Sequence, residues 1–306
     1  MRHLLILLAL LAAACGGRQQ RPAESDHSQL PAVFLPPIAP TEVAPEERFE
    51  WFRWHYWDTF DFADTLFVRR ADSIQMLEAY ARYILLITFE STDTSPMDSL
   101  MRKAAASRTM FDYFVWMGEE VVHDPNSPLR NDELYIPILE AQLASPYYDE
   151  YERIRPAYEL QVAQQNRIGR PANDFRYTLA SGATGTLYGL QAEYVLLFIN
   201  NPGCPMCREI REAIEASPML SEMIERGRLQ VLALYPDEDL EAWRDYAPQM
   251  PAAWINAYDA GSRIRENNLY DLRAIPALYL FDREKRVLVK DSTDVAAIEE
   301  VIDRAA

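Results

Sequence analysis

Cysteine and histidine are scarce in this chain. Its 306 residues include three cysteines and four histidines, and two of the cysteines lie in one short stretch, 198-FINNPGCPMCREI-210. A structural zinc site takes four ligands, and no second CxxC pair accompanies Cys204 and Cys207. The histidines beyond residue 14 all lie in the N-terminal half: His27, His55 and His123. We therefore expect neither a metal nor a cofactor at the cysteine pair.

Basic residues are also few. The chain has 30 Lys and Arg residues against 47 Asp and Glu residues, which gives a net charge of -17. Without residues 1–14, whose one charge is that of Arg2, the net charge becomes -18. Phosphate backbones and anionic lipid headgroups attract basic surfaces, so we expect no nucleic-acid partner.

Glycine is absent between Gly17 and Gly118, and the pattern from residue 45 to residue 167 is helical. In 72-DSIQMLEAYARYILLITF-89, apolar residues recur at spacings of three and four after an aspartate that can cap the helix. Further helices are expected over 97–121, over 131–144 and over 147–167, the last with a kink at Pro156. No clean internal repeat indicates a solenoid. The sequence predicts an all-α domain over residues 46–168.

An aromatic run, 51-WFRWHYWDTFDFADT-65, stands out within this half. Exposed aromatic side chains can anchor a bound peptide. More often such a cluster packs in a core, and we favour packing here. His55 is then expected to be a hydrogen-bonded structural residue.

The N-terminal block MRHLLILLALLAAAC has the pattern of a signal peptide, and its apolar run is too short to span a bilayer. Cys15 directly after three alanines resembles a bacterial lipobox, in which this cysteine is acylated and becomes the mature N-terminus. An ordinary cleaved signal with a coincidental cysteine is the alternative. Gly16 follows, with no aspartate, and resemblance to outer-membrane lipoproteins implies a lipid anchor at the periplasmic side of that membrane. Residues 15–45 would form the tether.

After Gly169 the pattern changes to short strands that alternate with helices. Strand-like runs at 174–180 and 185–190 flank the turn SGATG and predict a hairpin. Further strands are expected at 193–200, 228–236, 253–259 and, as a pair, within 277–291. Helices are expected from the cysteines to residue 224, over 239–247 and over 294–306. This order predicts an α/β domain over residues 169–306, with a mostly parallel sheet that ends in an antiparallel hairpin.

The cysteine pair follows a strand and opens a helix. Cys204 would lie at the helix N-terminus, where free N–H groups and the helix dipole stabilise a thiolate, and Cys207 would lie one turn further on. Cys204 could then attack a disulfide and Cys207 could resolve the mixed disulfide. A structural disulfide here closes a loop of four residues and stabilises the fold by about 2 kcal/mol. A redox pair is favoured over a structural or vestigial disulfide, and a metal site is the least favoured of the three.

Three segments in order, FRYTLASGATGTLYGL, EYVLLFINNPGCPMC and AIPALYLFD, resemble the thioredoxin-like fold, closest to the periplasmic thiol/disulfide oxidoreductases of the TlpA and ResA type. This resemblance implies that Pro276 follows a cis peptide bond and that the Ile275 backbone pairs with a bound substrate strand. The helical half, with its HYWDTFDFADT run, resembles the uncharacterised domain that precedes such modules in some bacterial lipoproteins.

The chain departs from this family at two places. Gly203 stands where an aromatic residue usually precedes the first cysteine, and the strand 195–199 is entirely apolar, without a buried acid. Glu209 and Glu212 are the nearby carboxylates. No PxxxTxxC-like segment is present, which disfavours a peroxidase.

The resulting expectation is an α+β multidomain protein with an all-α domain followed by an α/β thioredoxin-like domain. It would be a lipid-anchored periplasmic enzyme that reduces or exchanges protein disulfides, with protein thiols, protein disulfides and an upstream redox partner as its partners. The alternative is a membrane-anchored binding or adaptor protein that uses the thioredoxin-like domain as a scaffold.

Overall fold

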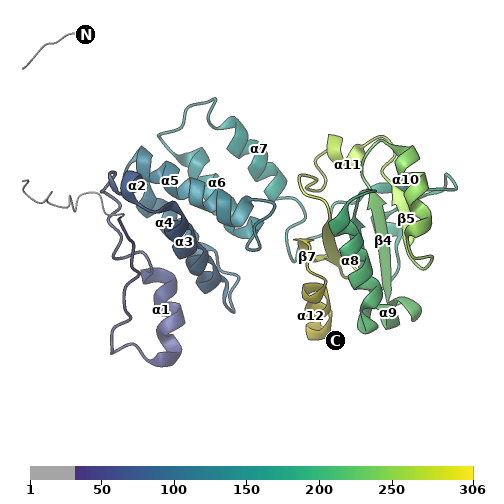
Figure 1. The fold of residues 1–306 in the computed structure, drawn as a ribbon, viewed down its shortest axis with the longest axis horizontal. Helices are drawn as coiled ribbons and strands as arrows, with labels where there is room; N and C mark the ends of the chain where they lie inside the picture. The colour runs from purple at the N-terminus through teal and green to yellow at the C-terminus, as the bar shows by residue number, and fades with distance from the viewer. Residues whose placement is uncertain (1–31, 306) are drawn as a thin grey trace, which may run out of the picture.

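The computed structural model describes residues 32–305, which form a helical part followed by a sheet part (Figure 1). The expected signal peptide, Cys15 and the first half of the tether lie outside the described residues. The helices of the first part are α1 (Arg48–His55), α2 (Phe67–Arg70), α3 (Ser73–Thr88), α4 (Ser95–Ala104), α5 (Arg108–Gly118), α6 (Asp132–Ala144) and α7 (Ile154–Ala163). A 3₁₀ turn, Pro45–Glu47, precedes α1, and a π-helical turn, Glu119–His123, extends α5.

Side-chain caps decide where several of these helices begin. Asp72 accepts hydrogen bonds from the amides of Ile74 (2.9 Å) and Gln75 (3.2 Å), which confirms the predicted start of α3. Asn131 caps α6 in the same way. A single helix over 97–121 is wrong: the Ser107 hydroxyl caps a new helix by accepting from the amide of Met110, so α4 and α5 are separate.

The predicted helix over 147–167 is also wrong at its start. The carboxylate of Asp149 accepts from the amides of Tyr151 and Glu152, and residues 150–153 form turns. Helix α7 begins only at Ile154, so Pro156 is its third residue. An amide in the first turn has no partner within the helix, and the proline therefore fits without a kink.

Part of the aromatic run packs in the core of the helical part. Tyr56, Trp57 and Phe60 are buried, which confirms the packing interpretation for these three side chains. The Trp57 ring stacks on Phe34, with ring centroids 4.6 Å apart. His55 Nδ1 lies 2.6 Å from an Asp58 carboxylate oxygen, in agreement with a structural role.

The second part is a mixed seven-stranded sheet in the order β2-β1-β5-β4-β3-β6-β7. Its strands are β1 (Arg176–Leu179), β2 (Thr184–Thr186), β3 (Tyr194–Ile199), β4 (Leu229–Tyr235), β5 (Ile255–Tyr258), β6 (Ala277–Phe281) and β7 (Val287–Ser292). The β1–β2 hairpin is confirmed, but the mostly parallel sheet is wrong. Of the strand pairs described for residues 32–305, only β3–β4 and β4–β5 are parallel. The reason is that β6 returns beside β3 in the opposite direction, with Ala277 opposite Ile199.

Helices cover both faces of this sheet. They are α8 (Pro205–Ala216), α9 (Pro218–Glu225), α10 (Leu240–Tyr246), α11 (Arg263–Glu266) and α12 (Val295–Ala305). Side chains of β3 alternate between the faces: Leu196 and Phe198 pack with α8, α9 and α12, whereas Val195, Leu197 and Ile199 pack with α11. The predicted helix from the cysteines to residue 224 is wrong, because Ser217 ends α8 and its hydroxyl caps α9 by accepting from the Leu220 amide.

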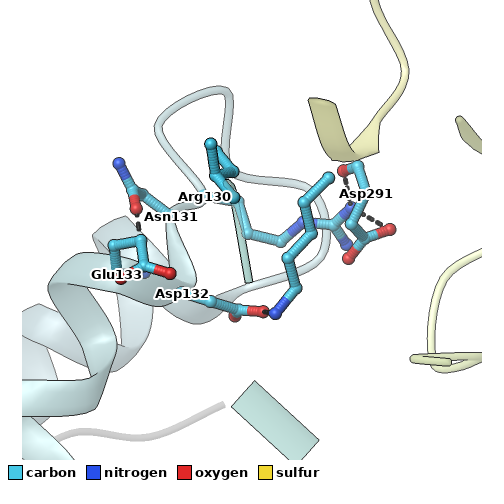
Figure 2. A pocket seen from close by; sticks show the side chains of 7 residues that line it. Arg130, Asn131, Asp132, Glu133 and Asp291 are labelled. Atoms are coloured by element: carbon cyan, nitrogen blue, oxygen red, sulfur yellow. Dashed lines mark hydrogen bonds and ion pairs between the residues drawn. The ribbon is translucent and has the colours of Figure 1, made fainter. Parts of the chain in front are cut away.

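Charged side chains join the two parts (Figure 2). Lys290 Nζ lies 2.7 Å from an Asp132 carboxylate oxygen and donates to the backbone carbonyls of Ala163 and Gln165. Arg130 donates to the backbone carbonyl of Asp291 (2.6 Å), and the same nitrogen lies 2.8 Å from its carboxylate. Each of these four side chains is at most 12% exposed, and together they line a cavity of about 140 Å³. They are Arg130, Asp132, Lys290 and Asp291. The contact between the parts is therefore ionic and largely buried.

Burial raises the pKa of Asp291 to about 7 from the ordinary 3.8. Arg130 and Lys290 oppose this shift, whereas the carboxylates of Asp271 and Asp132 add to it. Between these two pKa values the unfolded chain has lost the proton that the folded protein keeps. Stability therefore falls as the pH rises from about 4 to about 7, and the cost of the buried charge is complete above that range.

Replacing Asp291 by asparagine should remove this cost. Asn keeps the shape of the side chain and tolerates the left-handed backbone at this position (φ 51°). We expect the Asp291→Asn variant to match the parent near pH 4 and to exceed its free energy of unfolding at pH 8 by about 2–4 kcal/mol. Urea unfolding of both proteins from pH 4 to pH 8 measures the difference. A difference that does not change with pH would contradict the prediction.

Candidate functional site

The site begins where β3 leaves the sheet. All six residues of β3 are buried, and the amide side chain of Asn200 continues its pairing. Asn200 Nδ2 donates to the carbonyls of Phe198 (3.1 Å) and Leu234 (3.4 Å). The end of the strand is thereby fixed to β4.

The next residue ties the loop to a neighbouring loop. Asn201 Nδ2 donates to an Asp237 carboxylate oxygen at 3.0 Å, and the guanidinium of Arg265 binds the other oxygen of Asp237. This network connects the approach to the cysteines with the ends of β4 and α11. Sequence reasoning missed it, since the only signal was a pair of asparagines after a buried strand.

The turn into α8 depends on glycine. Gly203 has φ +73°, a left-handed conformation that side chains with a Cβ rarely adopt. An aromatic residue would fit this backbone poorly. The conformation therefore gives a physical reason for the departure from the aromatic residue that the family resemblance leads one to expect.

Cys204 is the N-cap of α8, and Pro205 occupies the first helical position. The Cys204 sulfur accepts a hydrogen bond from the Cys207 amide at 3.1 Å. This amide belongs to the first turn, whose N–H groups have no partner inside the helix. The same donor would stabilise a thiolate on Cys204 after reduction.

Cys204 and Cys207 form a disulfide, with their Cα atoms 5.2 Å apart. Cys207 is fully buried and packs in the core with Phe198 and Ile210. Cys204 is only partly buried. Between them, Met206 is 52% exposed and borders an open groove of about 610 Å³ between α8 and α12. Of the two cysteines, only Cys204 is therefore partly open to solvent.

The Ile275–Pro276 peptide bond is cis, as the resemblance implies. Pro276 is buried directly before β6, and Ile275 packs against the core that contains Cys207. Because Ala277 pairs with Ile199, the loop with Pro276 and the loop with Cys204 lie at the same end of the sheet. Whether the Ile275 backbone binds a substrate strand stays a prediction.

Other candidate groups lie apart from this centre. Glu209 and Glu212 are exposed on α8. Within residues 32–305, no group of three or more His, Cys, Asp or Glu side chains could hold a metal ion. In the same range, no helix is both long enough and apolar enough to cross a membrane.

Comparisons with known proteins add to this geometry. Residues 14–166 match the family described as "Domain of unknown function (DUF5106)". A thioredoxin-like protein from Bacteroides caccae ATCC 43185, known from a crystal structure, is 42% identical; the match covers 89% of this chain and 99% of that chain, with a TM-score of 0.83. The C-terminal domain of an uncharacterized protein from Bacteroides fragilis NCTC 9343 is 47% identical, over 45% of this chain and 98% of that chain, with a TM-score of 0.44.

One curated protein also matches. Nucleoredoxin from Danio rerio is 26% identical over 102 residues, which are 33% of this chain and 24% of that protein. The match thus spans about a quarter of the curated relative's length.

The conformation of Gly203 can be tested by substitution. No heavy atom outside its immediate chain neighbours lies within 4 Å of an added Cβ, so the cost of a side chain is that of the backbone alone. We expect Gly203→Ala to lower the free energy of unfolding by about 1–2 kcal/mol and Gly203→Asn to lower it by less, because Asn tolerates the left-handed region. Urea unfolding of the oxidised proteins measures both. The assignment of a left-handed backbone would be wrong if Gly203→Ala were as stable as the parent, or if Gly203→Asn lost as much free energy of unfolding as Gly203→Ala.

Proposed function

This chain belongs to the DUF5106 family and to the thioredoxin-like proteins, and from that membership we propose that it is a thiol/disulfide oxidoreductase. Its reactive group is the pair Cys204 and Cys207, in the manner of the TlpA and ResA type. The observation that carries the proposal is the partly exposed residue Cys204, whose sulfur accepts a hydrogen bond from the Cys207 amide at the N-terminus of α8. A cis proline at the same end of the sheet supports it.

The reaction starts from the reduced pair. The Cys204 thiolate attacks one sulfur of a partner's disulfide, that S–S bond breaks, and the departing thiolate takes up a proton. The Cys207 thiol then loses its proton and attacks the Cys204 sulfur. This releases the partner's second thiol and forms the Cys204–Cys207 disulfide. The partner gains two electrons, and an upstream dithiol returns two electrons to this chain.

The two cysteines have different roles because they differ in burial. Cys207 has no exposed surface, so a protein partner can reach only Cys204. The loop with Ile275 and Pro276 lies where the partner's chain would pass, and the Ile275 backbone would pair with that chain. Protein thiols and disulfides are thus the proposed substrates, and no metal or cofactor takes part in the exchange.

The two cysteines should respond differently to substitution. We expect Cys204→Ser to lower the rate of insulin reduction at least about a hundredfold, because the attacking sulfur is lost. Cys207→Ser should still attack and should accumulate the mixed disulfide, which non-reducing mass spectrometry of the trapped partner detects.

Two outcomes would count against this division. A Cys204→Ser protein that reduces insulin at the parent's rate would exclude Cys204 as the nucleophile. A pair that dithiothreitol cannot reduce in the folded protein would favour the alternative, a binding or adaptor protein on a thioredoxin-like scaffold.

We also propose that Cys15 carries lipid and that the protein is anchored on the periplasmic side of the outer membrane. The support is the sequence pattern of residues 1–16. Several acyl chains together hold a protein stably at a bilayer, because each buried CH₂ contributes about 0.8 kcal/mol. Intact mass of protein from a lipoprotein-processing host should show an acylated N-terminal cysteine and the loss of residues 1–14. A free thiol at Cys15 would rule the anchor out.

A further inference from the structure

The loop that carries Ile275 and Pro276 contacts the helical part of the chain. This loop runs from the end of α11 to β6, and Arg273 lies three residues before Pro276. Arg273 Nε and Nη2 bind the two carboxylate oxygens of Asp271 at 3.0 Å and 2.6 Å. The bidentate contact fixes the guanidinium plane and leaves the third nitrogen, Nη1, free for another acceptor.

That third nitrogen reaches the helical part. Arg273 Nη1 lies 2.5 Å from Nε2 of His123, in the π-helical turn after α5. A guanidinium can only donate, so Nε2 accepts and the ring is neutral. Burial, and then the charge of Arg273, lower the pKa of His123, which keeps the ring in this state.

His123 is itself held firmly. Its ring stacks on Tyr135 of α6, with centroids 3.9 Å apart, and the Tyr135 hydroxyl donates to Glu159 of α7 at 2.7 Å. His123 Nε2, which accepts from Arg273, is therefore held between the π-helical turn after α5 and helices α6 and α7.

Within the sheet part the loop is anchored by Tyr270, whose buried ring packs on Phe175 and Tyr279. Toward α7 the loop is packed less closely. The Tyr158 hydroxyl of α7 donates to the Asn268 side chain at 3.1 Å. Beside this bond lies a cavity of about 160 Å³ between α7 and the loop, lined by Val162 and Leu272 among others. Because apolar side chains do not fill the contact with α7, polar bonds join this side of the loop to the helical part.

We propose that Arg273 is a positioning residue, through which the helical part fixes the loop of Ile275 and Pro276 for binding of a partner's chain at the disulfide. This rests on the proposed function, since it assigns the helical part a role in substrate binding by the same site. Arg273 takes no part in sulfur chemistry. Its contact with His123 sets the affinity for a protein substrate.

The test uses the full chain with His123→Ala, which removes the acceptor and leaves the pair of Arg273 and Asp271 intact. We expect KM for insulin to rise about tenfold, as for a lost hydrogen bond to a charged group. We expect kcat to change less than about twofold. The reaction of the reduced protein with 5,5′-dithiobis(2-nitrobenzoate) should stay at the parent's rate, because this small disulfide needs no contact with the loop.

Two further variants distinguish the loss of the contact between Arg273 and His123 from a general loosening between the two parts of the chain. His123→Gln should restore KM, since its amide oxygen can take the place of Nε2. Lys290→Gln breaks the contact between the parts at β7, away from the loop, and should lower stability without a change in KM. An unchanged KM in His123→Ala, or an equal rise in Lys290→Gln, would overturn the proposal.

Hydrogen exchange tests the position of the loop independently of the proposed function. Amides of residues 268–275 should exchange at least about tenfold faster in His123→Ala than in the parent, whether or not the protein reduces insulin. If the parent fails to reduce insulin, the proposed function fails, but faster exchange still supports the fixed loop. Unchanged exchange in these residues would overturn the positioning role of Arg273.

Discussion

The pairing of β3 with β6 is the constraint on which the rest of the site depends. It places Ile199 opposite Ala277, so the chain leaves β3 toward Cys204 at the point where Pro276 enters β6. Both strands are fully buried, and helices pack on each face. A slip of one residue would turn every buried side chain to the opposite face. The core thus specifies the register, and the register brings the two loops together.

The helical part meets the sheet part through charged and polar groups rather than through a continuous apolar core. One cluster, around Lys290 and Asp291, lies at β7. The other, around Arg273 and His123, lies at the loop before β6. Buried ion pairs contribute little net stability, because desolvation offsets their attraction, but they fix geometry. The polar contacts between the two parts therefore fix the position of the loop more than they stabilise the fold.

Local chemistry in the sequence was enough to predict part of this structure. The cap at Asp72, the hairpin at 174–190 and the cysteines at a strand-to-helix junction each depend on neighbouring residues. The breaks at Ser107 and Ser217 were missed because the apolar periodicity continues across them. The direction of β6 and the contact between His123 and Arg273, 150 residues apart, depend on tertiary packing and leave no local signal.

The proposed exchange requires the Cys204–Cys207 disulfide to cycle reversibly in the folded protein. Equilibration in glutathione buffers of graded ratio, followed by alkylation and intact mass, measures this cycling. We expect both thiols to appear together in one two-electron transition, while tryptophan fluorescence keeps its folded-state value. A disulfide that resists reduction until urea unfolds the chain would exclude the exchange.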